Sequence, residues 1–123
     1  MKKSQIPHEF QTLLPLTPAV FYVLFSLADG EKHGYAIMQE TKSLSSGKFQ
    51  MGPGTLYSTL QRLLDLSLIT EVDGPAASTE RDSRRRYYRL KASAKLLLEA
   101  ELARMDSAVR LAQRKKLVTR TTE

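Results

Sequence analysis

The sequence of 123 residues contains no cysteine and no tryptophan. Without cysteine there can be no disulfide, no thiol nucleophile and no cysteine-based zinc or iron–sulfur site. The longest uninterrupted apolar run covers seven residues, 19–25, whereas a membrane-spanning helix needs roughly 18. Polar residues follow the initial MKKSQ where a secretory signal would have its apolar core. We therefore expect a cytoplasmic protein with no membrane partner.

Catalytic motifs are equally scarce. The sequence has no Gly-rich phosphate-binding loop, no Gly-x-Ser-x-Gly motif and no plausible spacing of Ser, His and Asp. Its two histidines, His8 and His33, are not spaced as metal ligands, and we interpret His33 as a capping or packing residue at a helix start. We predict that the protein is not an enzyme and binds neither a metal nor another cofactor.

Positive charge is concentrated in the last third of the chain. The formal net charge is +6, to which residues 1–80 contribute −2 and residues 81–123 contribute +8. A charge run is often only a solvated face. Such asymmetry is also typical of proteins that bind a polyanion, either nucleic acid or an anionic membrane surface.

Apolar periodicity and capping residues divide the chain into a series of elements. Residues 1–16 are predicted to form an arm with at most a short helical turn. An almost wholly apolar helix, which we expect to be central, runs from Thr17 to about Ala28. The pattern predicts further helices at 33–44 and 53–66, strands at 68–72 and 85–91 joined by a long loop, and a long helix at about 93–117 with Ser93 as a candidate cap.

Three helices followed by a hairpin predict a mainly α (α+β) fold, a winged helix-turn-helix with a long C-terminal dimerisation helix. We divide the chain into an N-terminal arm (1–16), the winged helix-turn-helix domain (17–91), the dimerisation helix (92–118) and a frayed tail (119–123). In such a fold the third helix enters the major groove of DNA.

The third predicted helix suits DNA recognition. It begins at Pro53, so its first backbone amides can face a phosphate. Its outward side chains can bond base edges or phosphates: Thr55, Tyr57, Ser58 and Gln61. Arg62 is its only cation and is included among the candidate DNA contacts. Most of the electrostatic affinity must therefore come from Lys2, Lys3, Lys48 and the arginines of the wing: Arg81, Arg84, Arg85 and Arg86.

The long helix carries apolar residues at alternating spacings of four and three: Leu98, Leu102, Met105, Val109 and Ala112. This heptad seam is typical of a helix with a helical partner. The helix can fold back on its own domain or pair with a second subunit. We favour the second arrangement and predict a homodimer.

Five short segments occur in a specific order: His33-Gly34-Tyr35-Ala36-Ile37, Gly54-Thr55-Leu56-Tyr57, Leu60-x-Arg62-Leu63, Leu68-Ile69 and Arg85-Arg86-Tyr87-Tyr88-Arg89-Leu90. Each is weak alone. Together, over residues 13 to about 102, they resemble the PadR family of bacterial transcriptional regulators. Three departures from the family pattern occur. Ser67 stands where a Gly is usual, Lys91 and Ala94 replace the usual Thr and Gly before the long helix, and Thr41 replaces a typical aliphatic residue. A Gly adopts positive φ more readily than Ser does.

The resemblance implies a winged-helix repressor that binds a palindromic promoter site in double-stranded DNA as a homodimer. The family's contacts from its first conserved helix, its recognition helix and its wing correspond here to Tyr35, Thr55, Tyr57, Ser58, Gln61, Arg84, Arg85 and Arg86. Several members bind an effector that lowers DNA affinity. A small hydrophobic or aromatic effector is therefore a candidate partner.

The chain also permits a different function. Its basic amphipathic C-terminal helix could act as a membrane-surface or protein-interaction module without specific DNA binding. Acidic residues expected on the polar face dilute its positive charge: Glu99, Glu101 and Asp106.

Overall fold

The computed structural model describes residues 6–74 and 86–119 of the chain. Within these ranges the helices are α1 (His8–Gln11), α2 (Pro18–Ser26), α3 (Gly34–Leu44), α4 (Pro53–Asp65) and α6 (Ala92–Arg114). The strands are β1 (Lys32–His33), β2 (Ile69–Val72) and β3 (Tyr87–Leu90). The predicted mainly helical fold with a long C-terminal helix is confirmed.

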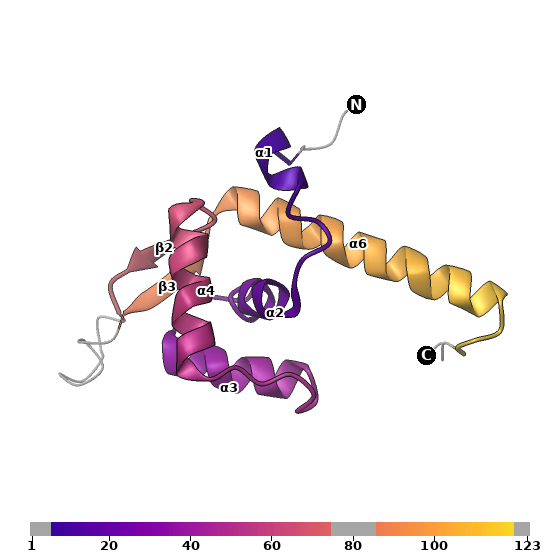
Figure 1. Ribbon diagram of the computed structural model, residues 1–123, viewed down its shortest axis with the longest axis horizontal. Coiled ribbons are helices and arrows are strands. Elements are labelled where there is room, and N and C mark those ends of the chain that lie inside the picture. The colour runs from indigo at the N-terminus through magenta and orange to yellow at the C-terminus, as the bar shows by residue number, and fades with distance from the viewer. Residues whose placement is uncertain (1–5, 75–85, 120–123) are drawn as a thin grey trace.

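Helix α2 occupies the centre of the fold, where it packs against α3, α4 and α6 (Figure 1). The N–H of Val20 donates to the Thr17 hydroxyl at 3.3 Å, and Pro18 takes the first helical position. Both features favour a helix start. Val23 and Leu24 are completely buried. This helix is thus the central one that its all-round apolar sequence predicts.

A three-stranded antiparallel sheet in the order β1-β3-β2 lies at one side of the helices (Figure 1). In the hairpin, Ile69 lies opposite Leu90 and Val72 lies opposite Tyr87. Strand β1 is the addition to the predicted elements, and it moves the start of α3 from His33 to Gly34. It contains only two residues and owes its existence to pairing with β3. No periodicity within its own sequence could reveal it.

Helices α3, α4 and α6 end on the same backbone motif. The residue after each C-cap has a positive φ, which is 54° at Ser46, 60° at Ser67 and 63° at Lys116. At the end of α4, the Leu68 N–H donates to the Leu63 carbonyl at 2.9 Å and the Ser67 N–H donates to the Leu64 carbonyl at 3.0 Å. These two bonds define a Schellman motif. The residue with positive φ in this motif, here Ser67, is most often Gly in proteins. The unfavourable conformation expected at Ser67 is therefore present.

Helix α6 begins at Ala92 with Lys91 as its N-cap and without a side-chain cap. The expectation that Ser93 caps it is therefore wrong, because Ser93 lies inside the first turn. The helix ends at Arg114, three residues before the expected end. Its C-terminal part extends beyond the other elements (Figure 1). Neither α6 nor any other helix within the described ranges has the length and apolarity needed to cross a membrane.

Glu101 is buried, with 1% of its surface exposed, so its expected place on the polar face of α6 is wrong. Its carboxylate accepts the Leu16 N–H at 3.1 Å and the Arg104 Nε–H at 2.8 Å. The hydrogen bonds from Arg104 lower the pKa of Glu101 more than burial raises it. Phe10 and Leu16 of the arm are buried in the same core. Glu101 therefore ties the N-terminal arm to α6.

Thr41 introduces a polar atom into the core. Its side chain is completely buried, and its hydroxyl oxygen has no hydrogen-bond partner among the described residues. An unpaired buried hydroxyl lowers stability. An aliphatic residue of the same shape would avoid this cost.

Candidate nucleic-acid interface

Helix α4 separates its side chains cleanly into a buried and an exposed face. Leu56, Leu60 and Leu63 are at most 1% exposed and anchor the helix in the core. The five candidate DNA-contact residues of this helix are all exposed: Thr55, Tyr57, Ser58, Gln61 and Arg62. The structure therefore brings these predicted residues together on one solvent-facing surface.

The start of α4 leaves its backbone amides available. Gly52 is the N-cap and makes no side-chain hydrogen bond, and Pro53 occupies the first helical position. The first turn contains no acidic residue. A helix N-terminus of this kind favours an anionic group such as phosphate.

Two of the exposed side chains on α4 have partners within the helix. The Ser58 hydroxyl donates to the Thr55 carbonyl at 3.1 Å. The Gln61 amide donates to Asp65 Oδ1 at 2.9 Å. This bond uses one of the two N–H groups of Gln61 and leaves its amide oxygen open to a base edge. This contact between Gln61 and Asp65 was not predicted from the sequence.

Tyr35 lies at the start of α3, with 59% of its surface exposed. Here His33 accepts the Ala36 N–H on Nδ1 at 3.2 Å, and its ring packs edge-on against Tyr87 at 5.3 Å. The predicted capping and packing role of His33 is confirmed. Across the described residues, no group of three or more His, Asp and Glu side chains is arranged to hold a metal ion.

The described part of the wing contributes Arg86. Its side chain is 76% exposed, and its Nε lies 3.2 Å from Glu71 Oε2. Sequence reasoning missed Glu71, because this contact depends on the register of β2 against β3. Arg81, Arg84 and Arg85 fall outside the described residues.

A buried tyrosine connects the wing to α4. Tyr88 is 3% exposed, and burial raises the pKa of its hydroxyl, with further upward contributions from Glu71 and Tyr57. A hydrogen bond with Arg86 opposes this rise. Tyr57 and Arg86, two candidate DNA contacts from different elements, thus lie close to the same hydroxyl.

The proposed dimerisation residues divide between two environments. Leu98 is 4% exposed and belongs to the core of its own domain. Leu102 and Met105 pack partly against that core, whereas Val109 is 37% exposed and Ala112 is partly buried. The seam therefore packs on its own domain at its first end and lies open at the other.

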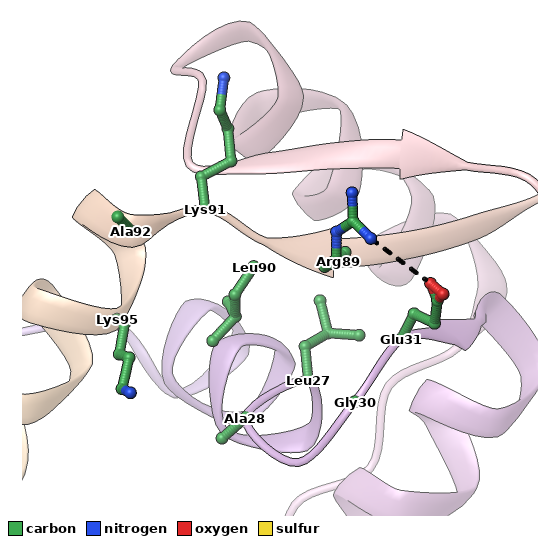
Figure 2. Close-up of a pocket in the computed structure, with 9 residues that line it drawn as sticks. All are labelled: Leu27, Ala28, Gly30, Glu31, Arg89, Leu90, Lys91, Ala92 and Lys95. Atoms are coloured by element: carbon green, nitrogen blue, oxygen red, sulfur yellow. Dashed lines mark ion pairs between the residues drawn. The ribbon is translucent and has the colours of Figure 1, made fainter.

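A shallow pocket of about 250 Å³ lies where the end of α2, the segment before β1, β3 and the start of α6 meet (Figure 2). Arg89 and Glu31 form an ion pair of 3.9 Å at its wall. Lys91 and Lys95 also line it, so four of its nine lining residues are charged. Sites for drug-sized ligands measure about 300–1,000 Å³ and are mostly apolar. The volume of this pocket lies below that range.

Comparison with solved structures shows the same fold in several bacterial proteins. A PadR family transcription regulator from Clostridium difficile R20291 has a TM-score of 0.66 and 21% identity, with 80% of this chain and 97% of that chain covered. A transcriptional regulator from Clostridium thermocellum has a TM-score of 0.62 and 17% identity, with 90% and 97% covered. Bacillus subtilis PadR, in a complex with operator DNA, has a TM-score of 0.57 and 24% identity, with 68% and 45% covered.

Family membership follows from the sequence itself. No curated protein matches the chain significantly. The family profile described as the transcriptional regulator PadR-like family matches residues 23–100, from within α2 into α6. This match covers more than half of the chain and includes α3, α4 and the hairpin. The chain therefore belongs to the PadR-like family of transcriptional regulators.

Proposed function

We propose that this regulator is a repressor that binds a palindromic promoter site in double-stranded DNA as a homodimer. The observation that carries the proposal is the exposed face of α4, which presents hydrogen-bonding side chains, together with the exposed Arg86 of the wing. In this arrangement α4 enters the major groove, while the wing and the start of α3 contact the flanking backbone. The related fold of Bacillus subtilis PadR, in a complex with operator DNA, supports it. Family membership also makes the protein a regulator rather than an enzyme.

Dimer formation is supported by the free end of α6. This end presents exposed apolar side chains that the described residues of the same chain do not cover: Val109, Leu111, Leu117 and Val118. A second copy of the chain would cover them and would place two copies of α4 about one helical turn of DNA apart. Two-fold symmetry of the protein would then match the symmetry of a palindromic site.

The direct test is fluorescence anisotropy with DNA from immediately upstream of the protein's own gene. A scrambled duplex of equal length serves as the control, and both are titrated at several salt concentrations. We expect the promoter duplex to bind at least about 10³-fold more tightly. Equal binding that weakens steeply with salt would indicate a non-specific basic protein. Binding to vesicles but to neither duplex would favour the membrane-surface alternative.

Two variants test the roles of α4 and the wing. Gln61→Ala should reduce the preference for promoter DNA, because a side chain that reaches base edges provides discrimination. Arg86→Ala should weaken binding to both duplexes similarly and reduce the salt slope by about one. Equal losses on both duplexes for both variants would contradict this division.

The effector stays a prediction. The pocket beside Arg89 is shallow and smaller than a typical site for a drug-sized ligand. Aromatic side chains elsewhere offer a better chemical match, since Tyr22 and Phe49 stack with centroids 5.6 Å apart and both remain partly exposed. Quenching of tyrosine fluorescence by planar aromatic compounds, with release of bound DNA as the second readout, would identify an effector.

A further inference from the structure

Gly34 is a point of close approach between α3 and α4. It is buried at the first position of α3. A methyl group placed on its Cα would lie 2.5 Å from the Tyr57 hydroxyl oxygen, 3.0 Å from Tyr57 Cζ and 3.3 Å from Leu56 Cδ2. The first separation is far below van der Waals contact. Tyr57 can therefore occupy its place only when residue 34 has no side chain.

The expected response to an added methyl group is movement of Tyr57. The colliding atoms are at the far end of its side chain, and this side chain is 50% exposed, so it can rotate into solvent. Gly74 provides a contrast, because a methyl group there would lie 2.8 Å from the ring of Tyr87, which is only 9% exposed. The absence of a side chain at Gly74 leaves room for a ring buried in the core. The absence of a side chain at Gly34 leaves room for the exposed hydroxyl of Tyr57.

We infer that Gly34 is a positioning residue for DNA binding, which holds the Tyr57 hydroxyl over the start of α3 where it can contact a DNA phosphate. The inference rests on the proposed function of α4 as the recognition helix. Gly34 thus affects DNA binding through the position of Tyr57 and not through the stability of the fold.

The surroundings of Tyr57 explain why its position matters. Tyr57 contributes to the raised pKa of the Tyr88 hydroxyl, and Arg86 acts in the opposite direction on the same pKa. Tyr35 is exposed immediately after Gly34. Rotation of Tyr57 into solvent would remove it from this group, which joins α3, α4 and the wing. Phosphate contacts made from one rigid group fix the register of a protein on DNA.

The test is a double-mutant cycle with Gly34→Ala, Tyr57→Phe and the double variant. Each dissociation constant is measured on the promoter duplex and on the scrambled duplex, because a phosphate contact acts on both. We expect Gly34→Ala and Tyr57→Phe each to weaken binding about tenfold, the usual effect of one lost hydrogen bond to a charged group. The double variant should bind within about threefold of Tyr57→Phe alone, because the hydroxyl is already absent.

Ser43→Ala is the control and should bind like wild type, because Ser43 is exposed near the other end of α3 and is not a candidate DNA contact. Thermal unfolding should show Gly34→Ala within a few degrees of the wild-type melting temperature. If Gly34→Ala binds DNA with the affinity of the wild-type protein, the inference is overturned. A loss from Gly34→Ala that is just as large in the Tyr57→Phe background would also overturn it.

NMR of the tyrosine rings separates this inference from the proposed function. Gly34→Ala should shift the ring resonances of Tyr57 and Tyr88 in the free protein while the core methyl resonances keep their positions. If the wild-type protein binds neither duplex, the proposed function fails, and the ring shifts alone decide whether Gly34 positions Tyr57. If the Tyr57 ring resonances do not shift in Gly34→Ala, the positioning role of Gly34 is overturned as well.

Discussion

Glu101 is buried, although its position in the sequence pattern predicts a place on the solvent-exposed face of α6. It is surrounded by apolar neighbours such as Leu97 and Leu98, yet it accepts hydrogen bonds from Leu16 and Arg104. A sequence pattern places a Glu in a helix on the solvent side by default, because isolated charges are rarely buried. Its partners come from the arm and from the next helical turn. Only the tertiary structure brings the arm there.

Glu101→Gln should lower the free energy of unfolding at pH 7 by about 1–3 kcal/mol, because the charged acceptor is lost. The pKa of Glu101 is lowered in the folded state, so its contribution is fully present above the ordinary value of 4.5 and disappears as pH falls through the folded-state pKa. Denaturant unfolding at pH 7 and at pH 3 measures this, and the difference between variant and wild type should shrink at pH 3.

Glu99→Gln is the control for Glu101, since Glu99 is exposed on the same helix. Its effect should stay within about 0.5 kcal/mol at both pH values. Equal stability of Glu101→Gln and wild type at pH 7 would show that the link to the arm contributes nothing.

At the scale of single elements, three helices end on non-glycine residues in the left-handed region. Ser67 illustrates why such a residue matters. Leu68 follows it directly and is buried in the core, so the backbone conformation of Ser67 sets the direction of the Leu68 side chain. The bonds of the Schellman motif hold this turn in place despite the conformational cost. A left-handed residue other than Gly costs roughly 1–2 kcal/mol.

Ser67→Gly should therefore raise the free energy of unfolding by about 0.5–1 kcal/mol, after the greater flexibility of Gly in the unfolded chain is subtracted. Guanidinium unfolding measures the change. Ser107→Gly is the comparison, since Ser107 is exposed in the interior of α6 and should lose up to about 1 kcal/mol. A loss of stability at both positions would contradict the account of the α4 terminus.

In the wing, the candidate DNA contact Arg86 forms an ion pair with Glu71. Glu71→Gln should strengthen binding to any duplex by about two- to fivefold, because Arg86 is then free for phosphate and a repelling charge is removed. Anisotropy at several salt concentrations measures both the affinity and its salt slope. Glu99→Gln makes the same charge change on α6, and a Glu71→Gln variant that binds no more tightly than this control would refute the competition.

The elements that the sequence predicts are those with local signals. Thr17 and Pro18 at a helix start, and the buried leucines of α4, each carry their information within a few residues. Strand β1 and the contact between Arg86 and Glu71 depend on pairing across the sheet. The candidate interface was therefore predictable in its α4 residues, whereas the partners of those residues and the close approach at Gly34 required the tertiary structure.

At the scale of the whole molecule, the free end of α6 is the feature that a monomer does not explain. Val109→Glu should shift the dimer toward monomer by at least about tenfold in the dissociation constant, because a charge would be buried without a partner in the dimer. Size-exclusion chromatography with light scattering measures the mass at several concentrations. DNA affinity should fall in parallel.

Ser107→Glu controls for the added charge, because Ser107 is exposed two residues earlier and faces another side of the helix. This variant should keep the mass of the wild-type protein. If Val109→Glu also keeps that mass, the open part of the seam is not the interface between two copies.

The bond between Leu16 and Glu101 spans 85 positions of the chain, and this separation has a consequence for protein synthesis. A ribosome builds the chain from the N-terminus, so the arm emerges long before the residue that anchors it. Until then, Phe10 and Leu16 lack part of the core that buries them in the finished protein. The arm is therefore translated well before Glu101 but can be fixed in place only after that residue has emerged.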